Sequence, residues 1–402
     1  MRREELMGNL EKLLSQIDIS PTMYENATKK YRALAEYLIA NGVPADFKPQ
    51  GSFRTGTVVR PLRNGEEANY DLDIMCQLHH DKKSIDPQKA KGIVGDTIEN
   101  SELYSAKLLP EDSCCWTLEY AKVDDSTGFL LDIVPCISSD HSYVDELICK
   151  GISSLFAQEA TDITSKLSSG KYVWVGSNSL GYALWFDSIN EPYIQLIRQQ
   201  YRSKLFAENR NIYSTIENVP KNLERSALQR VIQILKRHRD VFYYQANKWN
   251  YRPTSAIITT ICSQIASHTQ PTGDVFELLQ IVAEEISAHH VLETAISSAS
   301  FEGMRKDTYI KKYNGEWKIL SPVNPDDNFA SDWTNAHAQM FFKWINAVIE
   351  DFFVGLNESN GKYYVTLKNA FGKQLVERVL PETKTVSATV ISNGTKPWGM
   401  NE

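Results

Sequence analysis

The chain has 402 residues, of which 42% are hydrophobic, and this is enough to bury two cores. Its net charge is −7, whereas proteins that neutralise many phosphates of DNA or RNA usually carry a basic excess, so we expect no extended nucleic-acid surface. There is no apolar run near the ~18 residues of a membrane span and no CxxC spacing among the six cysteines, so we expect no membrane anchor, zinc site or disulfide framework, and a cytoplasmic location.

The N-terminal residues 1–45 are predicted to form two helices, because apolar residues recur there at helical spacing, namely Leu10, Leu13, Leu14 and Ile17. Strand patterns follow over 46–140. Beyond about residue 150 the pattern is mainly helical, and helices are predicted over 193–216, 223–247, 254–267, 275–302 and 335–356. The last segment, 383–402, is polar and is expected to be a flexible tail.

A Gly-Ser pair follows the first strand pattern. Gly51 lets the backbone approach a phosphate closely. Ser52 offers a hydroxyl and is predicted to open a short helix, whose first N–H groups favour an anion. Arg54, Thr55 and Thr57 add donors nearby. This segment therefore predicts a phosphate-binding turn, although a Gly-Ser pair alone is most often an ordinary turn.

Two aspartates lie about 20 residues further along the chain. Apolar and acidic residues alternate around Asp71 and Asp73, which is the pattern of a half-buried strand. Residues i and i+2 of a strand share a face, so the two carboxylates point the same way, with Cα atoms about 7 Å apart. A divalent cation removes their repulsion, and Mg²⁺ prefers a few carboxylates together with phosphates and water. The pair therefore predicts part of a magnesium site.

A third carboxylate, Asp132, stands in the apolar run 128–135, which predicts a largely buried strand. A carboxylate is costly there unless it is paired or binds a metal. The turn residues before the run predict a hairpin with 116–123. Asp132 is thus a candidate third ligand from a neighbouring strand, and a buried ion pair is the alternative.

Taken together, these motifs resemble the polymerase-β-like nucleotidyltransferase superfamily. The matching segment is 50–57 with Asp71, Asp73 and Asp132. Within the superfamily the chain is most similar to the bacterial CD-NTases, the cGAS-like and DncV-like enzymes that make signalling nucleotides in antiphage CBASS defence. Later segments carry this narrower assignment, namely 174–182 with 185–186, 235–240 and 324–330 with 333. The resemblance spans residues from about 45 to 335.

The resemblance implies an α+β fold. It places a polymerase-β-like nucleotidyltransferase core, a mixed sheet with flanking helices, over 46–150. A mainly helical nucleotide-binding lobe, like that of oligoadenylate synthetase, is expected over 151–382. The helices of 1–45 are expected to pack across both lobes, and 383–402 forms the tail.

Lys236 belongs to the predicted helix 223–247, whose stripe of apolar residues should face the core. In the CD-NTases a lysine on this helix contacts the donor phosphates, and Lys236 matches that position. The alternative is that Lys236 to Arg239 form a solvated face near the end of the helix.

Ser177, Asn178 and Tyr182 are candidates for holding a base or ribose, because Asn can read a base edge and Tyr can stack on it. The same residues also predict a simpler structure. Ser177 and Asn178 are typical of a helix N-cap, and Tyr182 fits a core position in the helix that follows. We favour the cap, with nucleotide contact as a second role.

The implied activity is a Mg²⁺-dependent nucleotidyltransferase that makes a cyclic di- or trinucleotide second messenger from NTPs, ATP among them. Asp71, Asp73 and Asp132 would hold two Mg²⁺ ions, for which Mn²⁺ can substitute, and Gly51, Ser52 and Lys236 would position the phosphates. Its expected partners are an effector activated by the cyclic nucleotide and a regulatory protein. The alternatives are a linear oligoadenylate, tRNA or poly(A) nucleotidyltransferase and a binding protein that has lost turnover.

Overall fold

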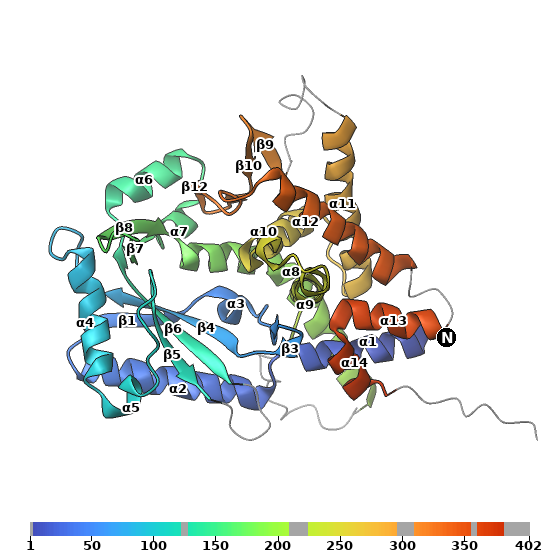
Figure 1. Cartoon of the computed structure of the whole chain (residues 1–402), viewed down its shortest axis with the longest axis horizontal. Helices are drawn as coiled ribbons and strands as arrows, with labels where there is room; N and C mark the ends of the chain where they lie inside the picture. Colours follow the sequence, from blue (N-terminus) through green and yellow to red (C-terminus); the bar gives the residue numbers. More distant parts are fainter. Residues whose placement is uncertain (1–2, 122–127, 209–223, 296–308, 355–359, 382–402) are drawn as a thin grey trace, which may run out of the picture.

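A six-stranded mixed sheet organises the first half of the chain (Figure 1). The computed structural model describes residues 3–121, 128–208, 224–295, 309–354 and 360–381. The strands are β1 (Ala45–Pro49), β4 (Tyr70–Leu78), β5 (Trp116–Tyr120), β6 (Phe129–Ser138), β7 (Thr161–Lys166) and β8 (Tyr172–Ser177). Their order is β1-β4-β6-β7-β8, and β5 also pairs with β6. Only the β4–β6 pair is parallel among these described strands.

One face of this sheet is covered by α2 (Pro21–Ala40) and α4 (Pro87–Glu99). Helix α2 begins at Pro21 because the Ser20 hydroxyl accepts the Met23 N–H at 3.2 Å. Apolar residues of both helices pack against the alternate residues of β4 and β6, including Leu72, Ile74 and Leu131. Three short helices and one short hairpin complete this lobe: α5 (Glu102–Ser105), α6 (His141–Cys149), α7 (Ser154–Ala157), and β2 (Leu62–Arg63) paired with β3 (Glu66–Glu67).

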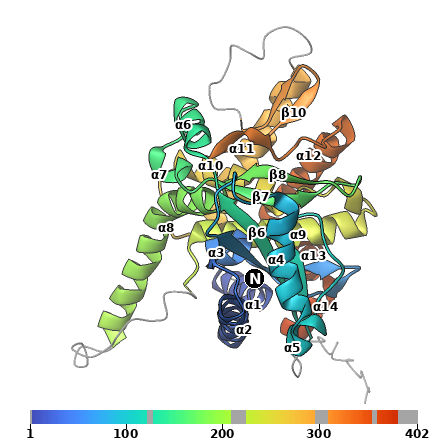
Figure 2. The same ribbon diagram turned by 90° about the vertical axis from the view of Figure 1, so that its left-hand side faces the viewer.

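A second, helical core forms around α9 (Ala227–Gln245), which contacts most of its neighbours. The surrounding helices are α1 (Arg3–Ile17), α8 (Ser179–Glu208), η1 (Trp249–Tyr251), α10 (Ser255–Ser267), α11 (Val275–Ala295), α12 (Asn335–Ile349), the π-helix η2 (Glu350–Val354), α13 (Asn360–Phe371) and α14 (Lys373–Val379). Two hairpins lie beside them: β9 (Lys311–Tyr313) with β10 (Glu316–Lys318), and β11 (Leu320–Ser321) with β12 (Asn324–Asn328). Figure 2 shows α8 projecting past the body of the protein.

The N-terminal helices divide between the two cores. The stripe of α1 predicted from Leu10, Leu13, Leu14 and Ile17 is buried in the helical core. The buried residues of α2 belong to the sheet core instead. The predicted α+β fold is confirmed.

The sheet is longer than the sequence pattern predicted. Strands β7 and β8 lie beyond residue 150, where we expected mainly helix, and they extend the sheet to Ser177. Helix α8 starts directly afterwards at Ser179, so the helix expected after the cap at 177–178 and the helix expected from 193 form one continuous helix. The strands are short and half-buried, so their alternation is weak, and they form because β6 offers β7 an edge to pair with.

The basic run Lys236 to Arg239 is not the solvated face that was one of the two sequence alternatives. All four side chains are at most 5% exposed, because α9 is surrounded on every side. Arg237 donates to the Phe371 and Arg60 carbonyl oxygens, and His238 lies 3.0 Å from the Asp351 carboxylate. The run therefore stabilises the helical core and adds no basic patch to the surface.

Several sequence predictions fall wholly or partly outside the described residues, namely the tail at 383–402, the helix ends at 209–216, 296–302 and 355–356, and the strand end at 122–123. Over the parts of the chain that the structure describes, every helix is either too short or too polar to cross a bilayer.

Candidate active site

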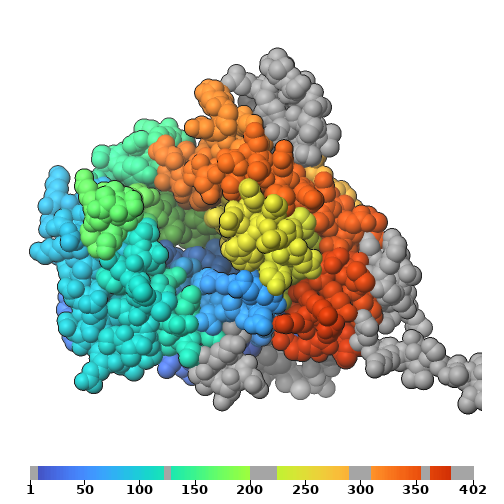
Figure 3. All heavy atoms as spheres, in the orientation of Figure 1, coloured from blue at the N-terminus to red at the C-terminus, as the bar shows by residue number. Residues whose placement is uncertain are grey.

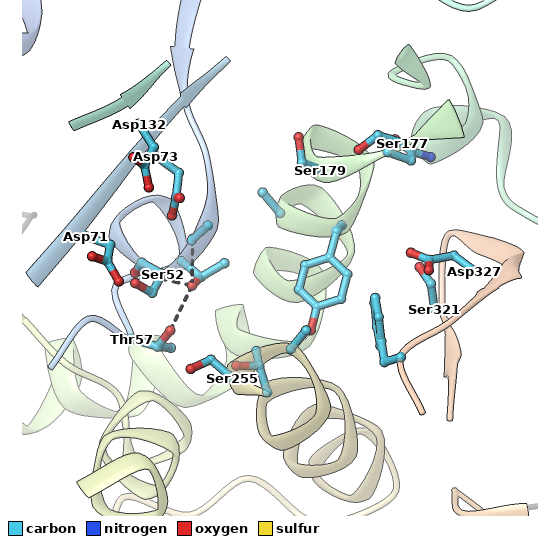
Figure 4. Close-up of a pocket in the computed structure, with 18 of the residues that line it drawn as sticks. Ser52, Thr57, Asp71, Asp73, Asp132, Ser177, Ser179, Ser255, Ser321 and Asp327 are labelled. Atoms are coloured by element: carbon cyan, nitrogen blue, oxygen red, sulfur yellow. Dashed lines mark hydrogen bonds between the residues drawn. The ribbon is translucent and has the colours of Figure 1, made fainter. Parts of the chain in front are cut away.

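Strand register brings the three predicted carboxylates together. Along β4, Asp71 and Asp73 alternate with the buried Tyr70 and Leu72, so both point away from the sheet core. Asp132 on β6 is the register partner of Asp73 across the parallel β4–β6 pair, and it lies on the same face. Figure 4 shows the three carboxylates as one group at one end of a cavity.

The cavity lies between the sheet and the helical lobe and has a volume of about 390 Å³. Figure 3 shows the recess where the blue sheet lobe meets the green and yellow helices. Besides the carboxylates, its lining comes from α3 (Gly51–Thr55) and the segment after it, from the start of α8, from α9 and α10, and from the β11–β12 hairpin: Gly51, Ser52, Thr55, Thr57, Ser177, Asn178, Ser179, Tyr182, Ala183, Lys236, Ser255, Ala256, Thr259, Ser321, Asp327 and Phe329.

Ionising all three carboxylates at once is unfavourable, because the negative charges repel one another. Burial, together with the charges of Asp132 and Asp71, raises the pKa of Asp73 to about 7. Burial also raises the pKa of Asp71, against the opposing charge of Arg63. Within the described residues, no three Asp, Glu, His or Cys side chains lie close enough together to hold a metal ion as they stand. The donor set still suits a hard divalent cation, because carboxylate oxygens that repel one another at a cavity wall are stabilised when a cation lies between them.

This electrostatic cost predicts a pH dependence of stability. The pKa of Asp73 is raised in the folded protein, so between pH 4 and pH 7 the native state holds a proton that the unfolded chain has lost. The free energy of unfolding in EDTA should therefore fall as the pH rises through this window. Asp73→Asn should remove part of that fall, which urea titrations at pH 5 and pH 7.5 would measure. An equal pH dependence in wild type and variant would contradict the assignment.

The predicted Gly-Ser turn packs directly against Asp73. The Gln50 N–H donates to the Asp73 carbonyl oxygen at 2.9 Å, and the short helix α3 starts at the next residue. Gly51 has φ +62°, and a Cβ atom there would lie 2.2 Å from Asp73 Oδ2. Only glycine suits this position. The amides of Gly51 and Ser52 precede the first intrahelical bond, which joins the Arg54 N–H to the Gln50 carbonyl oxygen at 3.4 Å.

Lys236 reaches this turn from α9 across the boundary between the lobes. Its ammonium donates to the Thr57 carbonyl and hydroxyl oxygens, both at 3.1 Å, and the Thr57 hydroxyl lies 3.0 Å from that of Thr55. Burial and the charge of Arg239 lower the pKa of Lys236 to about 7, although Asp240 and Asp73 oppose the shift. A bound anion would stabilise the charged form. Its predicted phosphate role stays a prediction.

Arg54 lies elsewhere. Although it was predicted as a nearby donor, its guanidinium pairs with Asp187 of α8 at 2.6 Å and it does not line the cavity. The other added donors, Thr55 and Thr57, do line it.

Asn178 forms the cap that the sequence favoured. Its Oδ1 accepts the Gly181 N–H at 3.1 Å, and its Nδ2 donates to the carbonyl oxygens of Phe156 and Val323 at 3.0 and 3.2 Å. With these bonds its amide is occupied by the fold. Ser177 lines the cavity beside it (Figure 4). Nucleotide contacts by Ser177 and Asn178 remain predictions.

Two residues near the carboxylates or in the cavity were missed by sequence reasoning. Thr117 on β5 donates its hydroxyl to Asp132 Oδ1 at 2.5 Å, because it is the register partner of Asp132. The predicted hairpin could have revealed it, but a predicted pairing does not by itself fix the strand register. Asp327 comes from the β11–β12 hairpin, almost 200 residues away in sequence; it lies in the segment 324–330 that carried the family resemblance, but it was not singled out as a site residue.

Comparison with known protein families identifies a nucleotidyltransferase domain in the sheet lobe. Residues 45–133 match the profile described as "Cyclic GMP-AMP synthase DncV-like, nucleotidyltransferase domain". No curated protein sequence matches the chain significantly.

Solved structures match over nearly the full length. CdnG, the CD-NTase of Bradyrhizobium diazoefficiens in complex with GTP, has 18% identity and a TM-score of 0.63, over 92% of this chain and 96% of its own. CdnC of Escherichia coli MS115-1 with ATP has 14% identity and a TM-score of 0.55, over 91% and 97%. CdnC in its complex with HORMA-deltaN has 13% identity and a TM-score of 0.55, over 91% and 96%. At these identities the likeness establishes a shared fold.

Proposed function

Because this chain is a nucleotidyltransferase with the CD-NTase fold, we propose that it joins NTPs into a cyclic di- or trinucleotide second messenger. One observation carries this proposal. The register pair Asp73 and Asp132, with Asp71 beside it, lies at the end of an inter-lobe cavity and directly against the Gly51 turn. A carboxylate group and a phosphate-binding turn at one point are what a nucleotidyl transfer requires.

We propose that Asp71, Asp73 and Asp132 hold Mg²⁺, with two ions in the complete site and Mn²⁺ as a substitute. When bound, the ions supply charge neutralisation to the triphosphate and lower the pKa of the attacking hydroxyl. The raised pKa of Asp73 supports this, because the nearby positive charge of Lys236 does not offset burial and the repulsion from Asp132 and Asp71.

The chain's own residues align the reactants. The amides of Gly51 and Ser52, with the Ser52 hydroxyl, hold the β- and γ-phosphates of the donor NTP. Asp132 has one oxygen bonded to Thr117, so its other oxygen can accept the proton of the attacking ribose hydroxyl. The hydroxyl oxygen forms a bond to the α-phosphorus while the bond to the β-phosphate breaks, and pyrophosphate leaves. A second transfer closes the ring.

Lys236 is proposed to stabilise the phosphates through the turn that it holds. Replacing it by Met keeps the buried stem but removes both bonds to Thr57. We expect the KM for NTP to rise about 10- to 100-fold, because a charge-assisted contact is worth roughly 1.5–3 kcal/mol. Initial rates against NTP concentration would measure this. An unchanged KM would remove the phosphate role, and thermal unfolding would show whether the variant is simply destabilised.

The nearest alternatives share the same three aspartates. A linear oligoadenylate or RNA-type nucleotidyltransferase would use the same chemistry without closing a ring. The negative net charge of the chain favours small substrates over a nucleic acid chain. A binding protein without turnover is disfavoured, since all three carboxylates and the Gly51 turn are present.

The deciding experiment incubates the protein with Mg²⁺ or Mn²⁺ and α-labelled NTPs, singly and mixed. A phosphatase-resistant product without free ends, identified by mass, would support the cyclase. A phosphatase-sensitive ladder would favour linear polymerisation. Absence of product in every mixture, despite Mg²⁺-dependent NTP binding, would favour the binding protein.

We also propose a biological role for the product and a protein partner for the enzyme. The product would activate an effector in antiphage defence of the CBASS type, inside a bacterial cytoplasm. A regulatory protein partner is also proposed, because CdnC, which shares this fold, has been solved in a complex with a HORMA protein.

A further inference from the structure

A threonine on the neighbouring strand holds one oxygen of Asp132. Thr117 of β5 is the register partner of Asp132 on β6, and its hydroxyl donates to Asp132 Oδ1 at 2.5 Å. Threonine is β-branched, so its χ1 angle is restricted on a strand and its hydroxyl has a defined direction. A hydrogen bond to a charged group is worth roughly 1.5–3 kcal/mol, which is enough to keep Oδ1 bound to Thr117. The other oxygen, Oδ2, is then the one left for a ligand.

A thiol supports this hydroxyl from its other side. Cys115 lies two residues before Thr117, so the two side chains share one face of the strand, and Cys115 Sγ lies 3.6 Å from the Thr117 hydroxyl oxygen. A hydroxyl has one hydrogen, and that of Thr117 goes to Asp132, so the Cys115 S–H donates to Thr117. Burial and the charge of Asp132 raise the pKa of Cys115 to about 12, which keeps the thiol protonated. The two hydrogen bonds therefore run in one direction, toward the carboxylate.

The backbone on both sides of Cys115 is anchored. Lys91 of α4 is buried, and its ammonium donates to the carbonyl oxygens of Asp112 and Ser113. The Trp116 indole N–H donates to the Lys91 carbonyl oxygen at 3.0 Å. The start of β5 is thus fixed to α4, and the thiol and the hydroxyl are held in place by the fold itself.

Building on the proposed function, we propose that Thr117, supported by Cys115, is a positioning residue that fixes which oxygen of Asp132 faces the reactants. With Oδ1 bound to Thr117, Oδ2 serves the cation and the attacking ribose hydroxyl. To present both oxygens to one ion, the carboxylate would have to break its bond to Thr117. The ribose hydroxyl therefore meets a proton acceptor of defined orientation, and the cation meets a single oxygen of Asp132.

Thr117→Val removes the hydroxyl and keeps the shape of the side chain. At saturating Mg²⁺ we expect kcat to fall about 10- to 100-fold, because partners that orient a metal ligand are worth factors of this size. The KM for NTP should change by less than about 2-fold, because the proposed phosphate contacts lie on the Gly51 turn. Thr117→Ser keeps a hydroxyl and should recover most of the lost kcat. An equal loss in both variants would assign the effect to shape and overturn the proposal.

Titration with Mn²⁺ alone tests Thr117 without turnover, with the electron paramagnetic resonance signal of the free ion as the readout. In Thr117→Val the Asp132 carboxylate is free to rotate, so Mn²⁺ should bind about 10-fold more weakly, and Thr117→Ser should restore the affinity. Wild-type values of both kcat and Mn²⁺ affinity in Thr117→Val would overturn the proposal. Thr117→Ala, which also lacks the hydroxyl, replaces Thr117→Val if thermal unfolding shows that variant to be destabilised.

Thr164→Val is the matched control. Thr164 lies on β7 of the same sheet and is fully buried, and within the described residues its hydroxyl has no hydrogen-bond partner. The same substitution there removes a hydroxyl that orients no other side chain. It should leave kcat and Mn²⁺ affinity at their wild-type values.

Cys115→Ala tests the support behind Thr117. It removes a donor to the Thr117 hydroxyl, and because S–H is a weak donor we expect kcat to fall only about 2- to 5-fold. Cys115→Ser keeps a donor at the same place and should retain wild-type kcat. A greater loss in Cys115→Ser than in Cys115→Ala would contradict the supporting role of the thiol.

The outcomes separate the positioning role from the proposed function. A protein that forms no product, yet loses Mn²⁺ affinity in Thr117→Val and regains it in Thr117→Ser, would contradict the cyclase and support the role of Thr117. A cyclase whose Thr117→Val variant keeps wild-type kcat and Mn²⁺ affinity would support the proposed function and overturn the positioning role.

Discussion

Replacing Asp71 by Asn is expected to lower turnover about 1,000-fold or more while leaving the fold intact. The side chain keeps its size, but one of the three negative charges at the cavity wall disappears, and with it a ligand for the proposed Mg²⁺. A 1,000-fold loss corresponds to about 4 kcal/mol of transition-state stabilisation. Asp132→Asn should have a similar effect, because it also removes the proposed proton acceptor. Pyrophosphate release from mixed NTPs measures both variants.

The control for this prediction is Asp46→Asn. Asp46 lies on β1, beside β4 in the same sheet, and it is exposed and pairs with His79 outside the cavity. Its variant should retain wild-type turnover. If Asp71→Asn and Asp132→Asn behaved like Asp46→Asn, the metal assignment would be wrong. Thermal unfolding of all three variants would show whether any loss reflects misfolding instead.

Gly51→Ala should abolish most activity through a single methyl group. A Cβ atom at this position would lie 2.2 Å from Asp73 Oδ2, closer than any non-bonded contact, so the carboxylate or the turn must move. Either movement separates the proposed phosphate-binding amides from the proposed metal ligands, and we expect at least a 100-fold loss of turnover. Because φ is +62°, a further cost of roughly 1–2 kcal/mol in stability is expected.

Gly42→Ala separates these two effects. Gly42 also has a positive φ, +89°, but an added Cβ atom meets nothing within 4 Å. This variant should share the loss of stability in urea unfolding and keep its turnover. If both glycine variants lost activity equally, backbone strain rather than the collision with Asp73 would be responsible.

Local sequence determined those parts of the site that lie on one element. The alternation around Asp71 and Asp73 specifies a half-buried strand with both carboxylates on one face, because the side-chain period of a strand is two residues. The Gly-Ser pair specifies the turn and short helix for a similar local reason. The order of these motifs indicated the polymerase-β-like superfamily, and the later segments 174–182, 235–240 and 324–330 indicated the resemblance to the CD-NTases, which the profile match and the shared fold support.

Strand pairing determines which residues of neighbouring strands lie opposite one another, and the alternation within one strand does not. Asp132 was predicted on a neighbouring strand, but its position opposite Asp73 depends on the β4–β6 register. The partner Thr117 depends on the β5–β6 register in the same way. Strands β7 and β8 carry weak patterns of their own and form because β6 leaves an edge to extend.

Burial in the helical lobe was decided only by the tertiary structure. A run of Lys, Arg, His and Arg near the end of a helix is typical of a solvated face, yet the packing of α10, α12 and α13 around α9 buries all four side chains. That burial brings the Lys236 ammonium to Thr57, across the boundary between the lobes.

The chain by itself thus determined the three candidate carboxylates and the proposed phosphate-binding turn, because strand period, glycine conformation and charge repulsion act over a few residues. The tertiary structure alone placed Lys236 beside the turn and Asp327 across the cavity from Asp73. Those placements join segments that lie more than 150 residues apart in sequence, and they depend on how two separate cores pack against each other.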